Sequence, residues 1–97
     1  MTPEEVKELV IQVITEIQTL SGRLVPDDIY DELHPIGEFD GFDSINAVEM
    51  TSLLSEYLGY DIKSDLMLPT YPGGHLTIGE MVDRLQQSIG AEGGLLT

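Results

Sequence analysis

The chain has 97 residues, 41% of them hydrophobic, and 18 Asp and Glu against four Lys and Arg, which gives a formal net charge of −14. This size predicts one small folded domain, and the shortage of cations argues against nucleic-acid binding, which needs Lys and Arg to neutralise phosphates. Because there is no cysteine, a disulfide framework, a thiolate metal site and a cysteine nucleophile are excluded.

The acidic excess also bears on partners and location. A net charge of −14 exceeds the magnitude of about 2 to 8 that keeps a small domain soluble, which favours partners with basic surfaces. Solubility alone is the simpler alternative. The sequence shows neither a signal-peptide pattern nor an apolar run of membrane-spanning length, so we expect a cytoplasmic protein without membrane insertion.

The first predicted element is an amphipathic helix over residues 3–20, where apolar side chains recur along one face at helical spacing. Thr2 and Glu5 match a capping box, and Pro3 suits the first helical position. Gly22 can end the helix in the left-handed conformation.

Residues 21–43 are predicted to form a long connection. The segment PDDIYDEL (26–33) is expected to add a helical turn, and Gly37 and Gly41 to mark turns. The apolar residues expected to hold this connection against the core are Ile29, Leu33, Ile36, Phe39 and Phe42. The acidic residues interpreted as a solvated face are Asp27, Asp28, Asp31, Glu32, Glu38 and Asp40.

A second helix is predicted for residues 44–58, with Asp43 as its N-cap and Gly59 at its end. The residues expected on its core face are Ala47, Met50, Thr51, Leu54, Tyr57 and Leu58. The opposite, polar face contains Glu49, Ser52 and Glu56. Ile45 falls on that polar side, where an apolar residue is unexpected.

The remainder predicts a short element near residues 63–68, a loop over 69–75 and a last helix. Thr77 and Glu80 match a second capping box at the start of that helix. Its apolar stripe ends at Ile89, and residues 90–97 are expected to form a flexible tail.

The predicted fold class is therefore all-α. We expect a single domain over residues 1–97, with its core in residues 3–89. The expected architecture is a small four-helix bundle of three longer helices and one short helix.

The sequence offers little for stand-alone catalysis. His34 and His75 stand beside turn residues without the spacing of metal ligands, and nothing aligns Ser44 with a His and an Asp as a triad. The acidic connection lacks the ligand pattern of an EF-hand, and no glycine-rich phosphate loop occurs. These observations indicate a non-catalytic protein.

Ser44 and Ile45 are the residues whose placement needs an explanation. A serine at a helix start is commonly a cap, and single exposed apolar residues are common. Here Asp43 supplies the cap, which leaves a free hydroxyl beside an exposed apolar side chain at the positive end of a helix. A phosphate ester there would be favoured by backbone N–H groups and the helix dipole, although Asp40 and Asp43 oppose it.

The stretch GFDSINAVEM (41–50) resembles the acyl carrier proteins of fatty-acid and polyketide synthesis, whose motif is Asp-Ser-Leu at the start of the second helix. The residues that carry the match are Asp43, Ser44, Ile45, Val48 and Glu49. The resemblance covers about residues 3–89 and implies a four-helix bundle. It also implies that a phosphopantetheinyl transferase attaches 4′-phosphopantetheine to Ser44, and that the arm's thiol carries an acyl group as a thioester.

The resemblance further implies contacts around that arm. Asp43, Ile45 and Ile62 would lie near the prosthetic group. The residues that would be recognised by basic patches on acyl-transferring and chain-elongating enzymes are Ile45, Asn46, Val48, Glu49 and Glu56. The carrier is expected to act as a monomer.

Departures from the family pattern, among them a thinner acidity on the outer face of the second helix, suggest a specialised carrier rather than a housekeeping one. Asn46 stands where many fatty-acid carriers have an acid, Lys63 stands where Pro is frequent, and residues 69–75 lengthen the last connection. That insertion is a partner contact, a wall of an acyl pocket or a plain surface loop. A peptidyl or aminoacyl carrier is the close alternative, and a cofactor-free acidic helical adaptor is the alternative from another class.

Overall fold

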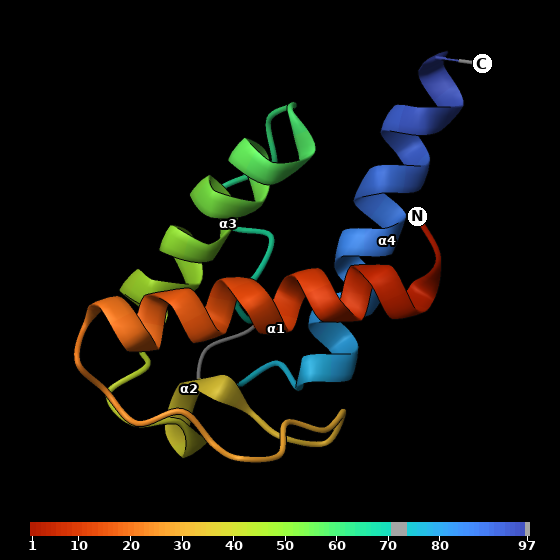
Figure 1. Cartoon of the computed structure of the whole chain (residues 1–97). Coiled ribbons are helices and arrows are strands. Elements are labelled where there is room, and N and C mark those ends of the chain that lie inside the picture. The colour runs from red at the N-terminus through yellow and green to blue at the C-terminus, as the bar shows by residue number, and fades with distance from the viewer. Residues whose placement is uncertain (71–73, 97) are drawn as a thin grey trace.

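The computed structural model describes residues 1–70 and 74–96, with side chains described through residue 90. The helices, in chain order, are α1 (Pro3–Leu20), α2 (Pro35–Glu38), α3 (Ser44–Leu58) and α4 (Ile78–Leu96). α1 packs against both α3 and α4, and the connection that contains α2 runs below α1 in the view of Figure 1. The fold is therefore an all-α bundle of three longer helices and one short helix, which confirms the predicted class.

The long helices begin at the capping residues that the sequence indicates. Thr2 N donates to Glu5 Oε1 at 2.9 Å and Glu5 N donates to Thr2 Oγ1 at 3.2 Å. The same reciprocal pair joins Thr77 and Glu80 at 2.9 and 3.1 Å. Both predicted capping boxes are thus confirmed, and each satisfies N–H groups that a helix start leaves without intrahelical partners.

The helix ends agree with the sequence for α1 and α3 but not for α4. Gly22 and Gly59 follow α1 and α3 with φ values of +69° and +80°, a conformation that glycine adopts without strain. α4 continues to Leu96, beyond the end expected near Ile89. The backbone of residues 90–96 is therefore helical, in contrast to the tail we expected, and Thr97 lies outside the described residues.

One cluster of buried apolar side chains connects the three long helices with the loops between them. Phe39 and Phe42, from the long connection, are 5% and 3% exposed and meet edge to face with ring centroids 6.4 Å apart. This confirms that the connection is held against the core. Tyr57, in contrast, was wrongly placed on the core face of α3: it is 47% exposed, and its hydroxyl donates to Glu16.

The helical turn in the long connection lies later in the chain than predicted. Residues 26–33 are not helical, and the short helix is α2, at residues 35–38. The carbonyl groups of Asp31 and Leu33 instead accept hydrogen bonds from Gly79 N at 3.0 Å and Ile78 N at 2.8 Å. The connection therefore satisfies free N–H groups at the start of α4, a tertiary use of its backbone that competes with local helix formation.

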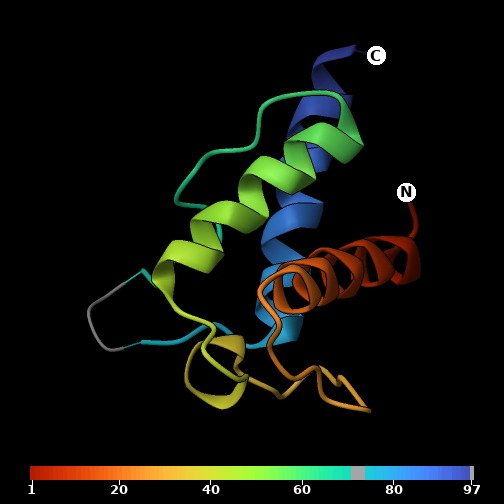
Figure 2. The ribbon, with the colours of Figure 1, turned by 60° about the vertical axis from the view of Figure 1, so that its left-hand side comes forward.

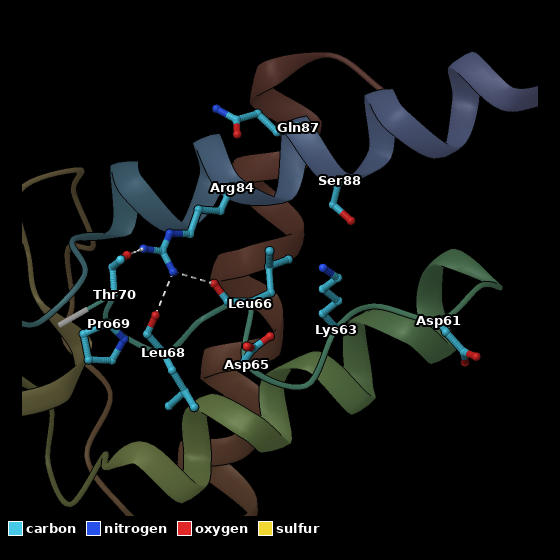
Figure 3. A pocket seen from close by; sticks show the side chains of 10 residues that line it. All are labelled: Asp61, Lys63, Asp65, Leu66, Leu68, Pro69, Thr70, Arg84, Gln87 and Ser88. Carbon is cyan, nitrogen blue, oxygen red and sulfur yellow. Dashed lines mark hydrogen bonds between the residues drawn. The ribbon is translucent and has the colours of Figure 1, made fainter. Parts of the chain in front are cut away.

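The short element predicted near residues 63–68 is a pair of turns instead of a helix. Its backbone hydrogen bonds join residues three positions apart: Leu66 N donates to Lys63 O and Leu68 N donates to Asp65 O, each at 3.0 Å. Arg84 of α4 donates to the Leu66 and Leu68 carbonyl groups at 3.0 and 2.7 Å (Figure 3). These carbonyl groups are thus bound by a side chain instead of a following helical turn.

No described helix is long and apolar enough to cross a membrane. The radius of gyration is 12.9 Å, close to the value of about 12.5 Å expected for a folded domain of this length. Of the predicted insertion over residues 69–75, residues 71–73 lie outside the described part of the chain.

Candidate functional site

The start of α3 is built around the side chain of Asp43. Its Oδ1 accepts hydrogen bonds from Ile45 N at 3.0 Å and Asn46 N at 3.2 Å. In return, Oδ1 of Asn46 accepts a hydrogen bond from Asp43 N at 3.1 Å. Asp43 is therefore the N-cap, as predicted, and the pair forms a capping box that includes an asparagine.

Ser44 is the first residue of α3 and is exposed. Because the Asp43 side chain accepts the capping hydrogen bonds, the Ser44 hydroxyl is not needed as a cap. It forms no hydrogen bond with any described residue. It is consequently an accessible, unengaged hydroxyl at the surface of the bundle.

The capping bonds change one expectation about a phosphate on Ser44. The N–H groups of Ile45 and Asn46, which an anion at a helix start would use, already donate to the Asp43 carboxylate. The dipole of α3 still favours negative charge at this end. A phosphate ester on Ser44 would therefore find these two backbone donors already bound to Asp43.

An apolar and acidic surface follows Ser44 along α3. Ile45 is 73% exposed and Val48 is 37% exposed, and Glu49 is exposed beside them. Their spacing of three and four residues places them on one side of the helix. Glu56 is also exposed, about two turns further along. We call Ile45, Val48 and Glu49 the α3 docking face.

Asn46, which the sequence placed among the recognition residues, is only 6% exposed. Its Oδ1 accepts from Arg23 Nη1 at 2.9 Å, and its Nδ2 donates to Glu49 Oε1 at 3.0 Å. These internal bonds use both ends of the amide. The structure thus gives Asn46 a buried, supporting position at the start of α3.

Ile62, which the resemblance placed near the prosthetic group, lies in the core. It is 8% exposed, and its N–H donates to Ser55 Oγ at 2.9 Å. Ser55 Oγ in turn donates to the Thr51 carbonyl at 2.8 Å. Ser55 therefore links the chain that follows α3 to the last turns of α3, a role that the sequence alone did not reveal.

Arg23 supports the motif from the neighbouring turn and was missed in the sequence. Its side chain passes close to Gly41 to reach Asn46. A Cβ atom at position 41 would lie 2.8 Å from Arg23 Nε, so a larger residue would collide with Arg23. Gly41 has a φ of +63°, which also favours glycine. The available signal was a single cation at the entrance of an otherwise acidic connection.

Gln18 is the second residue that the sequence reading missed. It is fully buried, and its Nε2 donates to the carbonyl groups of Leu24 at 3.2 Å and Asp40 at 2.6 Å. Asp40 Oδ2 accepts from Leu24 N at 2.9 Å. Gln18 thereby joins the turn after α1 to the turn before α3; its signal was a polar residue within an apolar helical stripe.

The charge around Ser44 is negative. Asp40, Asp43 and Glu49 are exposed. Three of the chain's four Lys and Arg side chains, in contrast, are bound within the molecule: Lys7 to Asp31, Arg23 to Asn46, and Arg84 to backbone carbonyl groups. Within the described residues, no group of three His, Cys, Asp or Glu gathers to hold a metal ion. The site therefore combines the Ser44 hydroxyl, the exposed apolar side chain of Ile45 and exposed acidic side chains.

A separate open depression of about 850 Å³ lies between residues 61–70 and α4 (Figure 3). Lys63, Leu66, Leu68 and Pro69 line it from one side, and Arg84 and Gln87 from the other. None of its lining residues belongs to the Gly41–Ile45 stretch. The depression is therefore distinct from the Ser44 surface.

Comparisons of the chain with protein-family models, with curated proteins and with solved structures found no match. Since no relative supplies an activity, the exposed Ser44 surface is the feature that points to a function.

Proposed function

We propose that the protein is a non-catalytic carrier that bears 4′-phosphopantetheine on Ser44 and presents acyl or polyketide intermediates to partner enzymes. The observation that carries the proposal is the exposed Ser44 hydroxyl at the first residue of α3, released from capping by Asp43 and followed by the exposed Ile45. The resemblance of Gly41–Met50 to acyl carrier proteins gives this arrangement its chemical meaning.

For the chemical step of attachment, this chain would supply an accessible oxygen nucleophile. Ser44 Oγ would form a bond to the phosphorus of coenzyme A that carries the pantetheine, while the bond from that phosphorus to 3′,5′-ADP breaks. The Ser44 proton would pass to a base of the phosphopantetheinyl transferase. Once attached, the arm supplies a thiol for thioester formation, which a chain without cysteine does not contain.

The geometry at α3 supports an arm that stays accessible. Because the Ile45 and Asn46 N–H groups are bound to Asp43, these two donors do not hold the ester phosphate against the helix. The arm would project from the surface beside the α3 docking face. Partner enzymes would then contact Ile45, Val48 and Glu49 while they reach the thiol.

The negative charge supports partners with basic docking patches, in the cytoplasm, with the carrier acting as a monomer. Acyl-transferring and chain-elongating enzymes are the expected partners. We favour a specialised pathway over housekeeping fatty-acid synthesis, since Asn46 replaces an acid of the family pattern and is used internally. Acyl cargo is favoured over aminoacyl or peptidyl cargo because of the strong acidity.

The test is incubation of the purified protein with coenzyme A and a broad-specificity transferase, followed by intact-mass measurement. We expect the gain of one phosphopantetheine group in the wild type and no gain in Ser44→Ala. Ser52→Ala, an exposed serine on the same helix, is the matched control and should gain the group. No gain in the wild type would show a cofactor-free protein such as an adaptor, and a gain in Ser44→Ala would place the arm elsewhere.

The loaded protein then separates the two cargo classes. Offered a malonyl transferase with malonyl coenzyme A, it should gain a malonyl group. Offered an adenylating enzyme with amino acids and ATP, it should remain unloaded. The reverse pattern would identify a peptidyl or aminoacyl carrier.

A further inference from the structure

We propose that Leu24, in the turn after α1, is a second apolar docking contact for the phosphopantetheinyl transferase that acts on Ser44. The inference rests on the proposed carrier function and adds a residue outside the α3 docking face. Leu20 and Leu24 are 85% and 77% exposed, more than the other large apolar side chains described. A single exposed leucine is ordinary; the way Leu24 is held is what sets it apart.

The backbone of Leu24 is bound on both sides while its side chain remains in solvent. Its N–H donates to Asp40 Oδ2 at 2.9 Å, and its carbonyl accepts from the buried Gln18 Nε2 at 3.2 Å. The preceding residue is fixed as well, since Arg23 N donates to Gln18 O at 2.8 Å. The backbone of Leu24 is therefore held in one position, which lowers the ordering cost of a contact made through this residue.

The same bonds place Leu24 next to the modified region. Arg23 lies across Gly41 and binds Asn46 of the first turn of α3, and Leu24 itself binds Asp40, just before Gly41. Figure 1 shows the C-terminal end of α1 close to the start of α3, and Figure 2, in which α1 is foreshortened, shows the start of α3 to the side of that same end. The turn that carries Leu24 is therefore adjacent to the start of α3, and an enzyme that covers both would contact Leu24 as well as Ser44.

The chemistry of the surface defines the occupant. Exposed carboxylates follow Leu24 along the chain, at Asp27, Asp28, Asp40 and Asp43. The cation beside it, Arg23, is bound to Asn46. The complementary surface on the transferase is an apolar pocket bordered by Lys or Arg side chains, in which the leucine is buried and the carboxylates meet opposite charge.

The experiment is steady-state transfer of phosphopantetheine from coenzyme A to the full chain, with the carrier as the varied substrate. We expect Leu24→Asp to raise KM for the carrier about tenfold or more, because burial of a leucine side chain is lost and a charge is added. Leu24→Ala should raise KM by a smaller factor, about threefold to tenfold, and kcat should stay within about twofold of the wild type in both. Tyr30→Ala is the control, since Tyr30 is a 47% exposed apolar residue of the same connection.

The outcomes separate the inference from the function on which it rests. If the wild type is modified and Leu24→Ala keeps the wild-type KM, Leu24 makes no apolar contact and the inference is wrong while the carrier function stands. An equal rise in KM for Tyr30→Ala would also overturn it, because the effect would not be specific to Leu24. If the wild type is not modified at all, the carrier function fails and this inference fails with it. Matching urea midpoints for the variants show that KM, and not folding, has changed.

Discussion

The Nη1 atom of Arg23 donates to Oδ1 of Asn46 at 2.9 Å and so ties the turn after α1 to the first turn of α3. The same amide oxygen accepts from Asp43 N at 3.1 Å. One buried side chain thus joins the capping box of α3 to a loop 23 residues earlier in the chain. This support lies behind Ser44 and Ile45, which leaves both of them facing solvent.

Removal of Arg23 should destabilise the fold. Arg23→Ala deletes a charge-assisted hydrogen bond to a buried amide, and we expect the free energy of unfolding to fall by about 1–2 kcal/mol. Lys63→Ala is the matched control, because it removes the same charge from an exposed residue. Urea denaturation at moderate salt measures both. Equal losses in the two variants would mean that the loss of charge, and not the bond to Asn46, determines the effect.

Gly41 and Gly59 allow a sharper test of how closely Arg23 packs. Both have positive φ, so alanine at either position should cost about 1–2 kcal/mol of backbone strain. Only at Gly41 does an added Cβ meet the Arg23 side chain, whereas nothing lies within 4 Å at Gly59. Gly41→Ala should therefore be the more destabilising change in urea denaturation, because Arg23 must move away from Asn46.

The excess cost at Gly41 should disappear when Arg23 is absent. In an Arg23→Ala background, Gly41→Ala and Gly59→Ala are expected to cost about the same, within about 0.5 kcal/mol. An excess that persisted in that background would place the clash elsewhere in the turn.

The α3 docking face should act on partners without acting on the fold. Ile45 is 73% exposed and Glu49 is exposed, so Ile45→Asp and Glu49→Lys should weaken turnover by partner enzymes and leave the helical circular dichroism spectrum unchanged. Ser52→Asp, a new charge at another exposed position of α3, is the control for Ile45→Asp. Loss of the helical signal in the Ile45 or Glu49 variant would show a structural role instead.

The helices were predictable because their signals are local. Capping boxes at Thr2 and Thr77, glycine at position 59 and apolar spacing each involve residues within one or two turns. The end of α4 was missed because glycine and a fading apolar stripe argue locally for an end, while the backbone stays helical to Leu96. Tyr57 was misplaced since periodicity does not reveal a hydroxyl bound to Glu16 at the surface.

The support of the candidate site was not predictable, because it depends on contacts between distant segments. Asn46 looked like a surface residue, and only the approach of Arg23 and the bonds to Asp43 and Glu49 show why it is buried. In the same way, Gln18 acquires its partners from residues 24 and 40. The exposure of Ser44 and Ile45 was predictable because the Asp43 cap and the helical spacing of residues 44–58 are local signals.

Glu80 gives the fold a defined dependence on pH. A hydrogen bond from the backbone N–H of Thr77 to its carboxylate lowers the pKa of Glu80 below its ordinary value of 4.5. A carboxyl whose pKa is lower in the folded state stabilises the fold fully above its unfolded value. That contribution is lost as the pH falls from about 4.5 through the lowered pKa, where the folded carboxylate becomes protonated.

Glu80→Gln removes the ionisation and keeps the shape of the side chain. We expect the variant to melt at a lower temperature than the wild type near pH 7, and the difference between them to shrink as the pH falls towards about 3. Thermal denaturation across this range measures the difference directly. Glu56→Gln, at an exposed position of α3, controls for the loss of one negative charge from a chain of net charge −14. A Glu80→Gln difference that stayed constant with pH would show that the carboxylate's charge does not contribute to the cap of α4.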